Sequence, residues 1–161
     1  MRRRRACAVL VAAFESMRVR EDFRIVHFSV QSNHVHLLCE ARDRRELARA
    51  IQSLAIRIAK RLNALWERAG RLFADRYRDR ILRSPREVRN ALGYVLNNAV
   101  HHGVRLVRGE PDPCSSGQWF DGWRGRVRAF ERSPNPLSRA RTWLLSIGWS
   151  RHGPIELAVG R

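Results

Sequence analysis

Residues 24–41 read RIVHFSVQSNHVHLLCEA, and this stretch decides the fold. Its two halves, residues 24–30 and 34–41, are rich in β-branched and aromatic side chains with partial alternation, a pattern typical of strands. The short polar segment between them, Gln31-Ser32-Asn33, is typical of a turn. We therefore predict an antiparallel β-hairpin, because two strands joined by so short a connection pair with each other.

Helices are predicted on both sides of this hairpin in the sequence. Residues 6–19 favour a first helix that turns Val9, Phe14 and Met17 toward a core. Asp43 and Glu46 form the spacing of a capping box, which predicts a long helix from there to about Arg68. Its apolar positions recur every three or four residues, as expected for a core-facing stripe: Leu47, Ile51, Leu54, Ile58, Leu62 and Leu65.

Three further elements are expected beyond Gly70. Residues 72–83 predict a strand centred on Tyr77 to Leu82. Ser84, Pro85 and Glu87 then mark a second helix start, and this helix runs to His101 or His102, where Gly103 stops it. Residues 109–126 read as a loop rich in Gly, Pro, Ser and Trp, and residues 137–147 as a short final helix.

The order helix, strand, strand, helix, strand, helix predicts an α+β fold. We expect a ferredoxin-like antiparallel sheet with helices on one face. That arrangement begins with a strand before the first helix, but Met1 falls directly at the helix, so we expect the first strand to be lacking. The domain division that follows is residues 1–103 as the main domain and residues 104–161 as a C-terminal extension with a short helix.

Charge is the most pronounced feature of the composition. The 161 residues include 32 basic and 15 acidic side chains, a formal net charge of +17, and every basic residue except Lys60 is Arg. Codon bias in a GC-rich genome explains Arg in place of Lys, but it does not explain the excess of positive charge. That excess predicts a polyanionic partner, most simply nucleic acid. No apolar run approaches the ~18 residues that would span a bilayer.

The cysteines and the N-terminal segment bear on location. Cys7, Cys39 and Cys114 are odd in number and lack metal-type spacing, so we expect free thiols in a reducing compartment, the cytoplasm. Arg2 to Arg5 followed by an apolar stretch resembles a secretory signal, which is the alternative. Phe14 and Glu15 stand where a cleavage site needs small residues, so an ordinary first helix is favoured.

Two groups of residues are candidates for chemistry. His34 and His36 share one face of their strand, so both imidazoles can reach one metal ion, although His-x-His is by itself a weak pattern and often structural. On the helix after Ser84, Tyr94 forms a polar stripe with Asn90 and Asn98 at spacings of four. A packing role for Tyr94 is the alternative.

Together these segments resemble a known family. QSNHVHLL, residues 31–38, is similar to the His-x-His signature of the single-tyrosine transposases of the HUH endonuclease superfamily. GYVLNN, residues 93–98, resembles their tyrosine helix motif, and residues 72–82 look like the strand before that helix in the branch associated with repetitive extragenic palindromes (REP). The resemblance covers about residues 20–103, and the tail resembles that of some bacterial members.

This resemblance implies a mechanism and a set of roles. His34, His36 and Asn98 would hold a divalent metal, Mg²⁺ or Mn²⁺, and Tyr94 would attack a phosphate of single-stranded, hairpin-bearing DNA. The product would be a 5′-phosphotyrosine link, and the protein could act as a homodimer. Basic side chains would hold the DNA backbone, and Trp119, Trp123 or Trp149 would stack on bases unless they belong to the core. The expected DNA-binding residues are Arg49, Arg57, Lys60, Arg61, Arg76 and Arg78.

Departures from the family pattern keep a second function open. Many relatives have a proline after the motif asparagine, where this chain has Ala99. The alternative is therefore a catalytically inactive or domesticated nucleic-acid-binding relic of the same fold. A small structural RNA-binding protein is a third reading, which gives Tyr94 no role.

Overall fold

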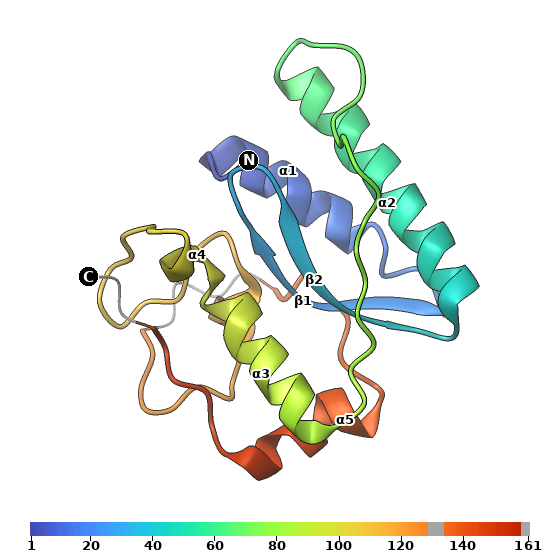
Figure 1. The fold of residues 1–161 in the computed structure, drawn as a ribbon. Coiled ribbons are helices and arrows are strands. Elements are labelled where there is room, and N and C mark those ends of the chain that lie inside the picture. The colour runs from blue at the N-terminus through green and yellow to red at the C-terminus, as the bar shows by residue number, and fades with distance from the viewer. Residues whose placement is uncertain (129–133, 159–161) are drawn as a thin grey trace.

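A computed structural model describes residues 1–128 and 134–158 of the chain (Figure 1). Its centre is the predicted hairpin, formed by β1 (Phe23–Val30) and β2 (Val35–Ala41), which pair antiparallel from Phe23–Ala41 to Val30–Val35. The register shifts at a bulge between Ile25 and His27. Within the described ranges the sheet has these two strands, and the fold class is α+β as predicted.

The two long helices α2 and α3 begin at the caps that the sequence marks, whereas α1 begins two residues earlier than predicted, and all three end earlier than predicted. α1 spans Arg4–Glu15 and α2 spans Arg44–Leu65, where the Asp43 side chain accepts a hydrogen bond from the Glu46 amide. α3 spans Pro85–Leu96, and its predicted capping box is complete, with Ser84 and Glu87 each accepting from the other's backbone amide. A break at Asn97 separates α3 from the short α4 (Asn98–His101).

The prediction that the helices share one face of the sheet is wrong. Phe23, Ile25, Phe28 and Val30 of β1 pack against α1 and α2 in a first hydrophobic core, to which Leu54, Ile58 and Leu62 of the predicted α2 stripe contribute. Val26 and Leu38 pack against α3 in a second core on the opposite face. The bulge explains how Phe28 and Val30 face the same core as Phe23 and Ile25, because it changes the alternation partway along the strand.

The strand predicted within residues 72–83 is also wrong. This segment forms no strand and connects α2 to α3 as extended coil. Leu72 and Phe73 anchor its start on the first core, and Leu82 anchors its end on the second, so the segment crosses from one side of the sheet to the other. Residues 74–81 between these anchors are exposed, because a run dominated by Arg and Asp has little apolar surface to bury in a sheet.

The chain after α4 packs onto both the sheet and α3. Cys114 O accepts from the Val30 amide at 2.8 Å, and the Ser116 hydroxyl accepts from the Phe28 amide at 3.0 Å, so residues 112–116 cover the outer edge of β1. Beyond η1 (Ser116–Trp119), the side chains of Phe120 and Ile155 join the second core against α3.

The final helix is shorter than the predicted residues 137–147. α5 spans Trp143–Ser146 and is followed by η2 (Gly148–His152). Its start is fixed by Glu40, whose carboxylate accepts from the Arg141 and Thr142 amides and the Thr142 hydroxyl, which holds residues 141–142 extended. Among the described residues, no helix is both long and apolar enough to cross a membrane.

The first helix and the cysteines follow the sequence-based expectations. α1 is an ordinary core helix, with Leu10 and Phe14 at most 1% exposed. Val9 packs against the same core, and Met17, just beyond the helix, is buried in it. All three cysteines are free thiols.

Candidate functional site

The candidate site lies at the start of β2, where the hairpin turn brings His34 and His36 side by side. Their Nε2 atoms are 3.1 Å apart, and their rings meet edge to face at 4.8 Å between centroids. Both side chains are only partly buried. The prediction that the two imidazoles share a direction is confirmed.

Asn33 contacts the ring of His34. The His34 Nδ1 atom lies 2.8 Å from Asn33 Oδ1, which is a hydrogen bond in the tautomer that carries its proton on Nδ1. In that tautomer the Nε2 atom of His34 keeps its lone pair and is the nitrogen available for a metal ion. Orientation of a ligating imidazole by a carbonyl oxygen in this way is usual in metal sites.

α3 brings Tyr94 to the same place. The Tyr94 ring stands edge to face with His36 at 5.2 Å between centroids, and on its other side it stacks on His101 at 5.9 Å. Tyr94 is 49% exposed, and among the described residues its hydroxyl has no hydrogen-bond partner. The phenol is thus held by ring contacts while its oxygen remains accessible to an incoming strand.

A third imidazole, which the sequence reasoning missed, joins the pair. The His102 ring lies 5.2 Å from that of His34, and the ligand nitrogens of His34, His36 and His102 all lie within 4.8 Å of one another. The sequence held a signal for it, since the polar stripe Asn90, Tyr94, Asn98 continues by the same spacing of four to His102.

The electrostatics of the site favour neutral imidazoles. Burial, together with the neighbouring His102, lowers the pKa of His34 below its usual value. Burial likewise lowers the pKa of His36, with His34 and His102 adding to the effect. A neutral ring has a free nitrogen lone pair, so these shifts keep the pair ready to coordinate a metal ion.

Asn98 is placed differently from the expectation of an open polar stripe. Its side chain is fully buried, and both Oδ1 and Nδ2 lack a hydrogen-bond partner among the described residues. Buried amides are almost always satisfied, so an unpartnered pair of polar atoms one helical turn from His102 suits a site that gains a further group when loaded. Imidazole nitrogens about 3 Å apart also suit two ligands of one ion at bond lengths near 2.1 Å. The residues present therefore fit a divalent metal.

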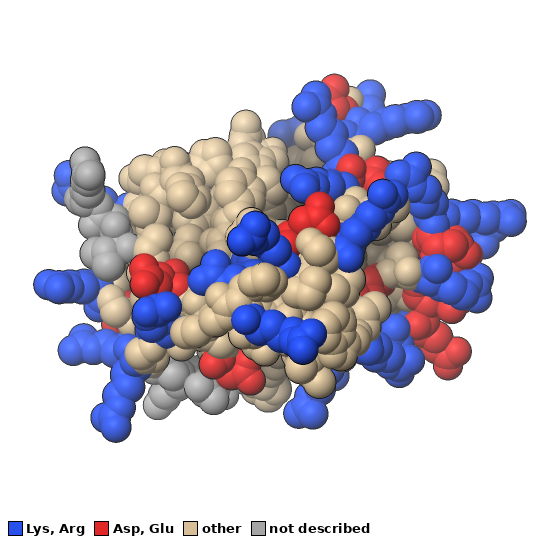
Figure 2. Space-filling view, turned by 60° about the horizontal axis from the view of Figure 1, so that its bottom comes forward, with Lys and Arg blue, Asp and Glu red and all other residues tan. Residues whose placement is uncertain are grey.

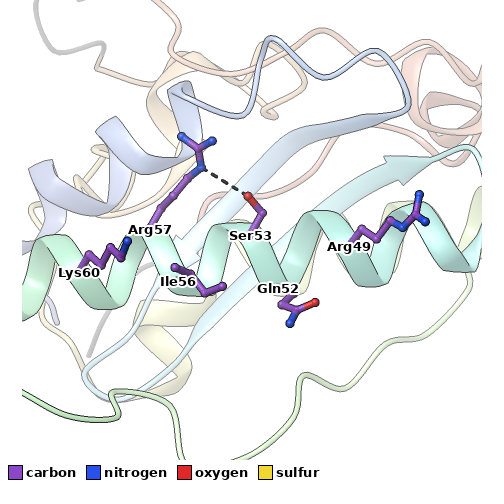
Figure 3. Close-up of a pocket in the computed structure, with 6 residues that line it drawn as sticks. All are labelled: Arg49, Gln52, Ser53, Ile56, Arg57 and Lys60. Atoms are coloured by element: carbon purple, nitrogen blue, oxygen red, sulfur yellow. Dashed lines mark hydrogen bonds between the residues drawn. The ribbon is translucent and has the colours of Figure 1, made fainter.

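The predicted DNA-binding side chains lie away from this cluster. Arg49, Arg57 and Lys60 line a shallow pocket of about 460 Å³ on the exposed side of α2 (Figure 3). Arg57 reaches back to the Ser53 hydroxyl at 3.5 Å. α2 packs on the sheet face opposite to α3, so these cations and the His–Tyr cluster belong to different sides of the sheet.

The remaining predicted cations are exposed. Arg61 lies on the outer side of α2, and Arg76 and Arg78 lie on the segment that crosses between the two sides. In Figure 2 the Lys and Arg side chains are spread around the visible face and do not gather in one patch. The suggested stacking roles of Trp123 and Trp149 are not supported, because both are buried in the second core, and Trp119 packs against the first.

The fold and the site together define a small α+β protein in which a His-x-His pair on a central hairpin faces a helical tyrosine. The comparisons agree with this class. A family model described as "Transposase IS200 like" matches residues 6–98, more than half of the chain, and the chain belongs to this family of transposases. No curated protein and no solved structure matches the chain significantly. Membership implies DNA as the partner and DNA cleavage and joining as the chemistry.

Proposed function

We propose that this chain cleaves single-stranded DNA and rejoins it through a 5′-phosphotyrosine intermediate on Tyr94, with a divalent metal held by His34, His36 and Asn98. The observation that carries the proposal is the contact between the Tyr94 and His36 rings at 5.2 Å. This contact joins two motifs that are far apart in the sequence. A packing role for Tyr94 does not require a half-exposed phenol beside an imidazole pair.

The reaction is a balanced exchange of two ester bonds. The Tyr94 oxygen forms a bond to phosphorus, and the bond from phosphorus to the 3′ oxygen of the neighbouring nucleotide breaks. The phenol loses a proton and the departing oxygen gains one, which leaves a free 3′-hydroxyl. Since the phosphodiester count is unchanged, a 3′-hydroxyl of another strand can attack the link, reverse the step and complete transfer without an external energy source.

Each side chain of the site has a separate role in the proposed reaction. Mg²⁺ or Mn²⁺, when bound, supplies charge that polarises the scissile phosphate. His34 and His36 hold that position, with His34 oriented by Asn33. His36 and His101 flank the Tyr94 ring and fix its direction. An extended single strand reaches the hydroxyl, whereas a base-paired duplex would not present one backbone phosphate so closely to a helix surface.

The charge distribution supports a DNA path that wraps around the protein. Arg49, Arg57 and Lys60 offer phosphate contacts on the α2 side, with Arg61 beside them. Arg76 and Arg78 lie on the connecting segment, between this side and the α3 side where the cleavage site is. A strand or hairpin stem bound along α2 would pass this segment before reaching Tyr94. We expect the substrate to carry a hairpin of the REP type, and the protein to act in the cytoplasm, as a homodimer where two ends are joined.

The test is formation of a covalent adduct that resists denaturant. The full chain is incubated with a 5′-labelled and a 3′-labelled hairpin-bearing single strand and Mn²⁺, and the products are separated under denaturing conditions. The adduct should carry the label located 3′ of the cut, because the 5′ phosphate stays on the protein. Tyr94→Phe should abolish it, because the substitution removes the attacking oxygen and keeps the ring contacts.

Tyr77→Phe is the matched control, since Tyr77 is the other tyrosine of the chain and is 45% exposed against 49% for Tyr94. An adduct that survives Tyr94→Phe refutes the assignment of the nucleophile. DNA binding without any adduct, across hairpin substrates and both metals, supports the non-catalytic relic instead.

A further inference from the structure

The third imidazole of the cluster has no role in the function proposed above. His102 follows α4 directly, and its amide donates to Asn98 O at 3.2 Å, so the two residues are stacked one turn apart. His102 is exposed, while His34 and His36 are partly buried. Three imidazoles, two at the start of a strand and one at a helix end, thus converge from different directions.

We propose that His102 is a ligand of the metal, so that the ion is held by three imidazole nitrogens and the site selects a first-row transition metal over Mg²⁺. This inference rests on the proposed metal site but not on DNA cleavage. Mg²⁺ prefers oxygen ligands and loses water reluctantly, whereas imidazole suits Fe²⁺, Ni²⁺, Cu²⁺ and Zn²⁺, and the affinity of a nitrogen site generally rises from Mn²⁺ through Co²⁺ to Cu²⁺. A third nitrogen ligand increases the preference of the site for these ions over Mg²⁺.

The helix break at Asn97 is what places His102. The Asn97 amide group does not continue the helix surface but binds the tail, donating from Nδ2 to Glu156 O at 3.0 Å and accepting from the Ala158 amide at 2.8 Å. These two bonds hold the change of direction between α3 and α4. After the break, His101 stacks on the phenol ring of Tyr94 and His102 lies against His34.

Exposure of His102 gives the site an open side. A catalytic metal needs protein ligands on one side and a free position on the other. Tyr94 and His102 are both exposed and border the solvent side of the cluster. A phosphate oxygen can approach the ion from this side.

The experiment measures metal binding by the full chain without DNA. Titration calorimetry with Co²⁺, Mn²⁺ and Mg²⁺, together with the visible absorption of bound Co²⁺, is carried out on the unsubstituted chain, on His102→Ala and on His152→Ala. His152 is an exposed histidine in η2 outside the cluster, so it controls for loss of any surface imidazole. Because His102 is exposed, its removal leaves both cores intact, which circular dichroism verifies.

Loss of a ligand should weaken Co²⁺ binding by at least about tenfold, or 1.4 kcal/mol, and change the Co²⁺ spectrum, whereas Mg²⁺ binding should change by less than about twofold. His152→Ala should match the unsubstituted chain. Equal Co²⁺ affinity and spectrum in His102→Ala overturns the inference, as does a site that prefers Mg²⁺. Failure here is separable from failure of the proposed function, because the Tyr94-dependent adduct is scored independently with DNA and saturating metal.

Discussion

Arg2→Ala should destabilise the protein far more than a substitution of one surface arginine among many. The Arg2 guanidinium forms a two-pronged ion pair with Asp112, with contacts of 2.6 and 2.8 Å, and donates to Val30 O at 2.7 Å. The Asp112 side chain is 0% exposed and that of Arg2 18%. This pair ties the start of the chain, the end of β1 and the tail into one contact.

The magnitude follows from what the substitution leaves behind. Asp112 would keep the Cys114 amide at 2.9 Å as a partner but would lose its only ion pair among the described residues while fully buried. Removing one partner of a buried pair costs about 3–5 kcal/mol, and the partial exposure of Arg2 favours the lower end, about 3 kcal/mol. For a chain of this size that corresponds to a melting temperature about 6–12 °C lower.

The assay is urea unfolding of Arg2→Ala beside Arg3→Ala. Arg3 is the neighbouring exposed arginine, and its side chain makes no capping bond to α1, so this control loses the same charge without breaking the ion pair. We expect it to change stability by no more than about 0.5 kcal/mol. Hydrogen exchange adds a local measurement, since the Val30 amide, which donates to Cys114 O, should exchange faster in Arg2→Ala. Equal unfolding midpoints for the two variants would refute the reasoning.

Two further predictions concern burial in the second core and beside it. Burial lowers the pKa of His27 to about 4 in the folded chain, against about 6.5 in the unfolded chain. As the pH falls below about 6.5, the unfolded chain therefore takes up a proton on His27 that the folded chain does not, and the folded state loses stability. Between pH 7 and pH 5 the chain should lose about 2 kcal/mol more stability than His27→Gln, and equal losses in urea unfolding would contradict this. Gly122→Ala would place a methyl group against the Trp149 ring and should cost about 1–3 kcal/mol, whereas Gly93→Ala, whose added carbon has its nearest neighbour at 3.8 Å, should be neutral or stabilising in thermal melting.

The elements that the sequence predicts well are those in which local chemistry and packing agree. The hairpin turn, the Asp43 and Ser84 caps and the apolar stripe of α2 each combine a local signal with a buried face. The His34 and His36 pair follows from the same logic, because residues two apart on a strand share a face. Such features depend on neighbours in the chain, which the sequence shows directly.

The errors arise where a distant partner decides the structure. Residues 72–83 contain enough β-branched and aromatic residues to resemble a strand, but a strand needs an edge to pair with, and the segment instead spans the two cores from Phe73 to Leu82. The helix expected from Leu137 starts only at Trp143, because the carboxylate of Glu40 holds the chain extended before it. The sequence of each segment does not show the distant residues that hold it, which are the two cores in the first case and Glu40 in the second.

The candidate site likewise combines features that the sequence predicts with features that depend on residues far away in the chain. A single continuous helix after Ser84 would keep Asn98 and His102 on the surface stripe that carries Tyr94, and the sequence favours that arrangement. In the structure the helix breaks at Asn97, which binds backbone atoms of Glu156 and Ala158, while Asn98 is buried and His102 lies against His34. The tail therefore does more than cover α3. Its backbone binds Asn97, which lies between Tyr94 and the third imidazole, although among the described residues it contributes no side chain to the His cluster.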